Sequence, residues 1–498
     1  MAVGDEEGIV RLLDSAGTGS RDRTNVGGTK SKSFDQTHLH FQTHGNAIID
    51  LEFSEDDYRL ATASGDQTGR VIDMMTQTPI ALLDQHTASL KQIRFQPGKG
   101  GGNVLATSSR DGSIKVWDLR CRGNIVQDFT VRRAVRLQYE PARVITQGCV
   151  VNNMVNAHAG IYRLARMQSS TPSADVTATR GEIPGRIGEV SVTALQFMPA
   201  GKEHLLLSAC EADTSVKLWD IRNVHASRQK TSTPVSFTAQ PESHVQWRPF
   251  GISAMSVSTD GARLYVVSKD NTVYAYATSH LITGHAPELA AKGEAPKRRN
   301  TTAQQGLGPI YGFRHDAFHA TTFYIKSAIR PPRDGRPEIL AVGSSDGCAI
   351  LFPTDERYLE ASATAVDSRT ALADPFSPSL PFPRVTPPVT AVVAPRGSQG
   401  RPALSRTSSS TNLNTGLVDA IPIYRTGTQL VRGHNREVGA LSWTNEGKLV
   451  TVGDDYLVRC WAEDRSHATS LRTGGEGQGR RWASGWADVG ADWDVEEG

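Results

Sequence analysis

Short stretches in which apolar and polar residues alternate recur along the chain, and turn-forming residues separate one stretch from the next. In residues 114–117 (IKVW), Ile114 and Val116 would face one side of a strand and Lys115 the other, as in a half-buried β-strand. Asp111 lies just before this stretch, in a predicted tight turn where a short carboxylate accepts backbone N–H bonds. Many such stretches with turn signals between them predict an all-β fold.

The alternating stretches share one fixed spacing. An acidic residue stands six positions before a large apolar residue in seven units, which are Glu7 and Leu13, Asp66 and Ile72, Asp111 and Trp117, Asp213 and Trp219, Asp270 and Tyr276, Asp346 and Phe352, and Asp455 and Trp461. Self-similarity at a fixed offset indicates a repeat architecture. Seven units of about four strands each predict a β-propeller, a fold that has about four to eight blades.

The units resemble WD repeats, in which His, Thr or Ser, Asp and Trp form a buried hydrogen-bonded chain. Two units contain all four residue types, and their tetrads are His86, Thr107, Asp111 and Trp117, and His434, Thr451, Asp455 and Trp461. His44 opens a further unit, and we expect His158 to open the unit that ends at Trp219. Because every member of a buried polar network needs its partner, we assign these residues a structural role. The predicted fold is a seven-bladed WD-repeat β-propeller with disordered insertions and a disordered tail.

Composition divides the chain around these units. Residues 1–14 resemble the last two strands of a blade and are expected to form a partial first blade. Further blades are expected over 38–352, with a flexible insertion near 168–187, and the last blade over 421–465. A Pro- and Ser-rich insertion and a Gly-rich tail lack strand periodicity and are predicted to be disordered, at 353–420 and 466–498.

Cysteine usage and charge exclude several classes of function. The five cysteines are scattered and form no CxxC pair, which argues against a disulfide framework or a zinc site and favours a reducing compartment. We therefore expect no metal and no cofactor. The net charge of +2 indicates neither direct nucleic-acid binding nor membrane binding. No stretch approaches the roughly 20 apolar residues of a membrane span.

The recurring His, Thr and Asp could suggest a hydrolase, but their positions argue against one. The same trio recurs in several units at predicted strand and turn positions, where it would be buried as part of the scaffold. No GxSxG nucleophile elbow accompanies it, and the GxxxxGK[ST] and HExxH motifs do not occur. We expect no catalytic residues and a platform whose function lies on its rims and loops.

Two arginines are the candidate partner-binding residues. The sequences WDLR (117–120) and WDIR (219–222) each place an arginine two positions after an aspartate, in consecutive units. We expect the two arginines to leave the same rim of adjacent blades, where guanidinium groups suit bidentate contacts with a partner. The alternative is that each arginine only pairs with its neighbouring aspartate. Two copies favour a partner, and the predicted adaptor-binding residues are Asp118, Arg120, Asp220 and Arg222.

The arginine pair resembles the motif by which WD-repeat substrate receptors bind the large damage-specific DNA-binding adaptor of cullin-four ubiquitin ligases. Longer segments resemble the denticleless family of such receptors, and a fungal member is expected. These segments are 6–12, 44–73, 89–95, 108–121, 321–329 and 433–443. The stretches NAIIDL with GDQT, and FYIKS, are more particular to this family than a generic WD signature.

The resemblance implies a non-catalytic substrate-recognition subunit of a cullin-RING ubiquitin ligase in the nucleus. It would dock the adaptor through Arg120 and Arg222, and the resemblance implies cullin four as a further partner. It would present degron-bearing replication and cell-cycle proteins held by the sliding clamp for degradation, in S phase and after DNA damage. The bound ubiquitin-conjugating enzyme would supply the catalysis, and the receptor would contribute proximity and orientation.

A second class of function fits the same fold. A WD-repeat scaffold in chromatin assembly or histone binding, without any link to ubiquitin, would need no functional arginine pair. Co-purification of the ligase adaptor would separate the two alternatives. The sequence identifies neither the substrates nor the residues that bind the degron, and it assigns no role to the tryptophans of the tail.

Overall fold

The computed structural model describes thirteen main segments and two short strands of the chain. The described residues are 1–13, 23–24, 30–31, 37–98, 102–121, 123–128, 143–158, 190–199, 201–223, 232–246, 249–283, 304–333, 335–359, 421–430 and 433–463. The segments predicted to be a flexible insertion near 168–187 and a tail at 466–498 lie outside the described residues, as do residues 360–420 of the predicted Pro- and Ser-rich insertion.

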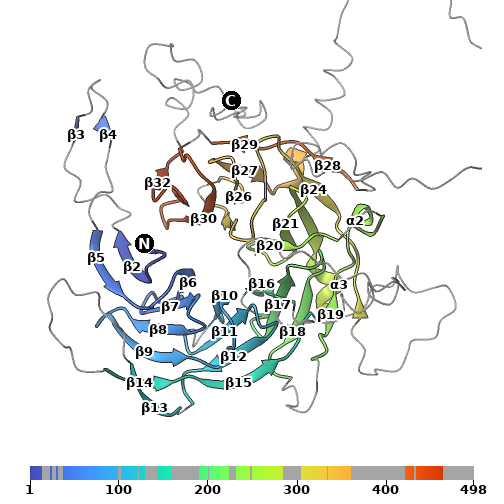
Figure 1. The fold of residues 1–498 in the computed structure, drawn as a ribbon. Coiled ribbons are helices and arrows are strands. Elements are labelled where there is room, and N and C mark those ends of the chain that lie inside the picture. The colour runs from blue at the N-terminus through green and yellow to red at the C-terminus, as the bar shows by residue number, and fades with distance from the viewer. Residues whose placement is uncertain are drawn as a thin grey trace, which may run out of the picture.

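Seven antiparallel-based sheets stand around a central axis, which confirms the predicted all-β, seven-bladed propeller (Figure 1). Blade 1 consists of β1 (Ala2–Gly4), β2 (Ile9–Leu13) and β5 (Thr37–Gln42). Blade 2 consists of β6 (Ile48–Phe53), β7 (Arg59–Ser64), β8 (Gly69–Asp73) and β9 (Thr78–Leu83), and is extended by β14 (Arg143–Gln147) and β13 (Ile125–Asp128). Blade 3 consists of β10 (Leu90–Phe95), β11 (Val104–Ser109), β12 (Ile114–Asp118) and β15 (Cys149–Met154).

The remaining blades follow in chain order around the ring. Blade 4 consists of β16 (Val192–Phe197), β17 (Leu205–Cys210), β18 (Lys217–Asp220), β19 (Ser236–Phe237) and β23 (Gln304–Gln305). Blade 5 consists of β20 (Ile252–Val257), β21 (Arg263–Ser268), β22 (Thr272–Ala277), β24 (Tyr311–Phe313) and β28 (Ile423–Tyr424). Blade 6 consists of β25 (Ser327–Arg330), β26 (Ile339–Gly343), β27 (Ala349–Pro353) and β29 (Thr428–Gln429), and blade 7 of β30 (Val438–Trp443), β31 (Leu449–Gly453) and β32 (Val458–Trp461).

A few short elements lie outside the blades. β3 (Arg23–Thr24) and β4 (Lys30–Ser31) form a separate two-stranded sheet, and the short helices α2 (Glu242–Gln246) and α3 (Thr278–Thr283) connect blades. In the described part of the chain, no helix has the length and apolar character needed to cross a bilayer.

The alternating sequence pattern explains how each blade is built. In blade 3, β11 and β12 pair in antiparallel register with Leu105 opposite Trp117. Gly112 has a φ of 77° in the turn between them, a backbone conformation that glycine adopts without steric cost. The first strands of successive blades lie next to one another around the axis, so the apolar faces of neighbouring blades pack together.

Buried apolar clusters join each blade to the next. Leu83, Leu90 and Trp117 belong to the cluster between blades 2 and 3, and Val116 and Trp219 to the one between blades 3 and 4. Burying side chains of this size contributes about 1.5–3 kcal/mol each, so the inter-blade packing holds the ring together. The hydrogen-bonded rims described below are therefore fixed on a rigid frame.

Two predicted boundaries differ from the structure. The predicted disordered insertion begins at residue 353, but Pro353 ends β27 and Leu359 is buried in the cluster between blades 5 and 6. The predicted last blade begins at residue 421, but β28 pairs with β24 of blade 5 and β29 completes blade 6, so blade 7 begins at β30. For β29 the reason is that the outer strand of blade 6 precedes the strands of blade 7 in sequence, so a sequence unit and a blade are out of step by one strand.

The first blade is also larger than residues 1–14. β5 pairs with β2 along its length, with Val10 opposite Phe41. The segment that completes this blade therefore comes from the residues just before the second unit, which the sequence assigned to a loop and to the start of the next blade.

Candidate functional site

Each complete tetrad forms one hydrogen-bonded chain. In blade 3, Trp117 Nε1 donates to Thr107 Oγ1 over 2.8 Å, and that hydroxyl lies 2.7 Å from His86 Nε2. His86 Nδ1 lies 3.0 Å from Asp111 Oδ2 in the turn between β11 and β12. Trp117 and Thr107 are fully buried, and His86 is almost so. The four side chains therefore fasten the interior of the blade to the rim.

The charges in this tetrad suit a scaffold better than a catalyst. Burial lowers the pKa of His86 and outweighs the opposing hydrogen bond from the Asp111 carboxylate, so the imidazole stays neutral at neutral pH. Burial would raise the pKa of Asp111, but hydrogen bonds from His86, Ser113 and the Thr87 N–H hold it well below its usual range. With its oxygens occupied by these donors, Asp111 has no role left as a general base.

The same arrangement recurs in two other blades. In blade 7, His434 lies 3.0 Å from Asp455 and 2.8 Å from Thr451, and Trp461 Nε1 donates to Thr451 over 2.9 Å. In blade 2, His44 makes equivalent bonds of 3.0 Å to Asp66 and 2.8 Å to Thr62, while Ile72 occupies the tryptophan position. The repetition of one geometry in three blades supports a structural role.

Two further histidines of this kind were not found from the sequence. In blade 5, His244 Nε2 lies 2.8 Å from Asp270 Oδ2, and the Tyr274 hydroxyl donates to the same oxygen over 2.6 Å. In blade 6, His319 Nδ1 lies 2.9 Å from Asp346 Oδ2. The signal was available, because these histidines stand 26 and 27 positions before their aspartates (270 − 244 and 346 − 319) and His86 stands 25 before Asp111 (111 − 86).

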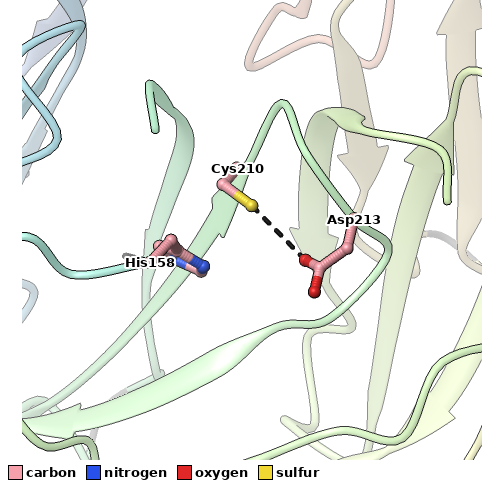
Figure 2. A group of neighbouring side chains, drawn as sticks. All are labelled: His158, Cys210 and Asp213. Carbon is pink, nitrogen blue, oxygen red and sulfur yellow. Dashed lines mark hydrogen bonds between the residues drawn. The ribbon is translucent and has the colours of Figure 1, made fainter. Parts of the chain in front are cut away.

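Blade 4 departs from this arrangement. His158 Nε2 lies 2.9 Å from Ser208 Oγ, which also accepts a bond of 2.8 Å from Trp219 Nε1. No hydrogen bond joins Asp213 to His158. Asp213 Oδ1 accepts from the Cys210 thiol over 3.4 Å (Figure 2) and from the Ser215 hydroxyl over 2.9 Å, and Oδ2 accepts from Gln240 Nε2 over 3.0 Å. His158 Nδ1 is buried without a hydrogen-bond partner.

A longer turn causes the departure. Ser208 stands five positions before Asp213 (213 − 208), whereas Thr107 stands four before Asp111 (111 − 107). The extra residue moves the carboxylate away from the histidine. His158, Cys210 and Asp213 thereby offer an imidazole, a thiol and a carboxylate whose ligand atoms all lie within 4.8 Å of one another. The cysteine spacing predicted no metal site, because spacing along the chain does not reveal three ligands that come from separate segments.

The predicted adaptor-binding residues form two matching forks. Arg120 Nε donates to Asp118 Oδ1 over 2.9 Å and its Nη2 to Oδ2 over 2.7 Å. Arg222 makes bonds of the same lengths to Asp220. The arginine side chains are 67% and 66% exposed, so most of each guanidinium faces solvent.

The forks keep both groups charged and oriented. The hydrogen bonds from the guanidinium groups lower the pKa of Asp118 and of Asp220, and the carboxylates in turn raise the pKa of Arg120 and of Arg222. The pairing of each arginine with its own aspartate is the alternative considered from the sequence, and the structure shows that pairing. It leaves other N–H donors of each five-donor guanidinium directed to solvent.

The two forks follow the third strands of adjacent blades, β12 of blade 3 and β18 of blade 4, whose first strands β10 and β16 lie side by side. A small pocket of about 190 Å³ lies beside the first fork, and Leu119 and Cys121 line it together with Ile80 and Gly148 of the neighbouring strands. This rim therefore carries two oriented guanidinium groups and, beside the first fork, a small pocket.

A third fork was missed because its surroundings lack the WD signature. Arg357 Nη2 donates to Asp355 Oδ2 over 2.7 Å just after β27 of blade 6, and its side chain is 86% exposed. The Asp-x-Arg spacing is visible in the sequence DER at 355–357. This fork lies on a blade that is not adjacent to the other two, which makes it a useful control.

Comparison with known proteins finds WD repeats and several similar proteins. The family model "WD domain, G-beta repeat" matches residues 35–73, 77–118 and 426–462. The cell division cycle protein cdt2 of Schizosaccharomyces pombe is 24% identical over 470 residues, which is 93% of this chain. Denticleless protein homolog A of Xenopus laevis is 28% identical over 72% of this chain, and the Homo sapiens denticleless protein homolog is 27% identical over 71%. The chain is thus similar to cdt2 and to the denticleless proteins over most of its length.

The match to the denticleless relatives extends well beyond the three WD units found by the family model. The matched region nevertheless spans 66% of the S. pombe protein and only 40% and 38% of the two vertebrate proteins. The chain therefore spans only part of the length of the curated relatives that it matches.

Proposed function

We propose that this propeller is the substrate-recognition subunit of a cullin-RING ubiquitin ligase, and that Arg120 and Arg222 dock the damage-specific DNA-binding adaptor. The observation that carries the proposal is the pair of matching Asp–Arg forks on adjacent blades. Each aspartate holds its arginine in one orientation before a partner arrives. Because a preorganised side chain loses less conformational entropy on binding, both arginines can engage one surface at a low entropic cost.

Two charged residues can contribute a large part of the binding free energy of such a contact. Truncating one partner of a buried, hydrogen-bonded charge pair costs about 2–5 kcal/mol of binding free energy, much of it from the group left unpaired on the partner. Strong binding residues also tend to cluster around pockets that an apolar partner group fills. The hollow lined by Leu119 and Cys121 lies directly beside Arg120 and suits such an anchor.

The tetrads support a receptor without catalytic activity of its own. Their aspartates and histidines are bonded to one another in the interior of the blades. We infer that the protein works in the nucleus, joined through the adaptor to cullin four, and presents degron-bearing replication and cell-cycle proteins on the sliding clamp. Its contribution to ubiquitin transfer would be proximity and orientation.

The test is a double variant, Arg120→Ala with Arg222→Ala, compared with wild type by adaptor pull-down and by thermal melting. Arg357→Ala is the matched control, because it removes an exposed arginine from the same kind of fork on a distant blade. We expect the double variant to lose the adaptor and the control to retain it. Both melting curves should stay close to wild type, since surface substitutions usually change stability by less than about 0.5 kcal/mol.

Two outcomes would contradict the proposal. Full adaptor binding by the double variant would remove the role assigned to these arginines. Failure of the wild-type chain to bind the adaptor would favour the second candidate, a WD-repeat scaffold in chromatin assembly. A pull-down with histones H3 and H4 in the same experiment would then test that candidate directly.

A further inference from the structure

Three buried side chains of blade 4 carry the donor atoms of a transition-metal site, and we propose that His158, Cys210 and Asp213 bind a divalent ion of the Zn²⁺ class. The three residues come from separate segments. His158 follows β15, Cys210 ends β17, and Asp213 lies in the turn before β18 (Figure 2). Their ligand atoms lie within 4.8 Å of one another, and no other group of this kind occurs among the residues that the structure describes.

The histidine supplies an independent indication of a ligand. His158 is fully buried and its Nδ1 has no hydrogen-bond partner, although buried polar atoms are nearly always satisfied. Its Nε2 is fixed by Ser208 Oγ at 2.9 Å. When Nε2 carries the proton and donates it to Ser208, Nδ1 presents a lone pair, and an outer hydrogen bond of this kind orients metal-binding histidines.

The donor set and its dimensions fit zinc. Imidazole nitrogen, thiolate sulfur and carboxylate oxygen are the three zinc ligands in proteins, with bond lengths of about 2.0–2.3 Å, which place donors of a tetrahedral site roughly 3.5 Å apart. Cys210 Sγ and Asp213 Oδ1 are already 3.4 Å apart. Mg²⁺ and Ca²⁺ prefer oxygen ligands, so a site with a thiol and an imidazole selects against them.

The charges balance through loss of one proton. Burial raises the pKa of the Cys210 thiol well above its usual value, so the metal-free thiol is protonated. Binding forms a sulfur–metal bond and breaks the S–H bond, and the proton leaves to solvent. The thiolate and the Asp213 carboxylate then offset both charges of the ion. Lys217, whose Nζ donates to the Ala157 carbonyl over 2.8 Å, lies nearby, and burial lowers its pKa. A water would complete a coordination shell that has three protein ligands.

Such an ion would do what the missing histidine–aspartate bond does in blade 3. It would tie the segment that leaves the outer strand of blade 3 to the rim of blade 4. The site lies inside the blade, away from the exposed forks, so metal binding and adaptor docking are separable.

The experiment uses the full chain purified without chelators. Elemental analysis would give its zinc content, and Co²⁺ titration of the metal-depleted protein would show a thiolate-to-cobalt charge-transfer band. We expect one ion per chain. Cys210→Ser should abolish the band and lower affinity at least ~10-fold. Serine is a conservative choice here, because Ser64 and Ser109 hold the equivalent strand end in blades 2 and 3.

Controls separate the site from the rest of the chain. Cys348→Ser changes a buried thiol of blade 6 and should keep the band and the stoichiometry. Asp213→Asn retains the shape of the side chain and should lower affinity without removing the sulfur ligand, so it tests the site even where the cysteine variant folds poorly. The Arg120→Ala, Arg222→Ala variant should bind metal like wild type whatever its effect on the adaptor.

Three results would overturn the proposal. The first is a wild-type chain that contains no zinc and gives no charge-transfer band with Co²⁺. The second is a band that persists in Cys210→Ser, which would assign the ion to another cysteine. The third is unchanged affinity in Asp213→Asn.

Discussion

Blades 3 and 4 carry the same spacing from aspartate to tryptophan and yet build different interiors. In blade 3, His86 reaches Asp111 directly, and Ser109 Oγ at the end of β11 accepts the Asp111 N–H over 3.1 Å. In blade 4, Cys210 holds the serine position and its thiol lies against Asp213. Blade 4 thus differs from blade 3 by one added turn residue and by a cysteine in place of a serine. These two changes distinguish its candidate metal site from the closed hydrogen-bonded network of blade 3.

The comparison shows which part of a repeat tolerates change. The tryptophan bond to the strand hydroxyl is kept in both blades, at 2.8 Å in each. The rim half of the tetrad, from histidine to aspartate, is kept in one and lost in the other. The interior half is packed between blades, so a change there leaves a cavity, whereas the turn at the rim can lengthen without disturbing the packing.

The largest effect should come from the tryptophan that bonds to the strand hydroxyl in both blades. Trp117→Ala and Trp219→Ala should each lower the free energy of unfolding by about 3–5 kcal/mol, because both rings are buried between blades and leave a cavity. Denaturant titration would measure both. A cost for Trp219→Ala well below that for Trp117→Ala would mean that blade 4 has lost more of its interior than the structure indicates.

A double-mutant cycle should detect the histidine–aspartate bond, which blade 3 has and blade 4 lacks. His86→Ala and Asp111→Ala should show a coupling of about 0.5–3 kcal/mol in unfolding free energy, because the two side chains bond directly. The cycle of His158→Ala and Asp213→Ala, measured in the presence of a metal chelator, should show a much smaller coupling. Equal couplings in the two blades would contradict the difference between them.

A repaired turn should recover part of that coupling. Cys210→Ser combined with deletion of Ala212 gives blade 4 the turn length and strand-end residue of blade 3. A restored bond from His158 to Asp213 should stabilise the metal-free protein by about 0.5–1.5 kcal/mol over Cys210→Ser alone. Thermal melting of the three proteins would show it, and a repaired variant that melts below both others would place the cause of the departure elsewhere.

The smallest effect should appear as a difference in pH dependence. Burial lowers the pKa of His86 and of His158 below the ordinary value of 6.5, and for His158 no aspartate hydrogen bond opposes the shift. Both histidines are neutral in the folded state, so their contribution is complete above pH 6.5 and is lost as the pH falls from there toward the folded pKa.

The measurement is the free energy of unfolding of metal-free protein between about pH 7 and pH 5, where His is the residue that ordinarily titrates. The two buried histidines should lower stability on acidification, whereas Glu52 and His319 have raised pKa values and act in the opposite direction. The test is therefore the difference from wild type: His158→Gln should remove more acid destabilisation than His86→Gln does. A larger change in His86→Gln would contradict the assignment of these charge states.

The sequence determined the features of this protein that depend on short separations along the chain. The seven units, the tetrads of blades 3 and 7 and the arginine forks depend on contacts between residues that the chain itself brings together. Arg120 lies two positions from Asp118, and Trp117 lies ten from Thr107 on the neighbouring strand (117 − 107), so a hairpin places each pair whatever surrounds it. Family resemblance added an expected partner for the forks, which their spacing could not supply.

Only the tertiary structure decided the contacts that cross long and variable connections. His158 stands 55 positions before Asp213 (213 − 158), and nothing in that interval predicts that a thiol lies between the two side chains. β28 adds a parallel strand to β24 of blade 5 and β29 pairs with β27 of blade 6, although both strands follow a long connection. A repeat motif fixes distances within a hairpin, whereas the packing of one blade on the next fixes which atoms of separate segments meet.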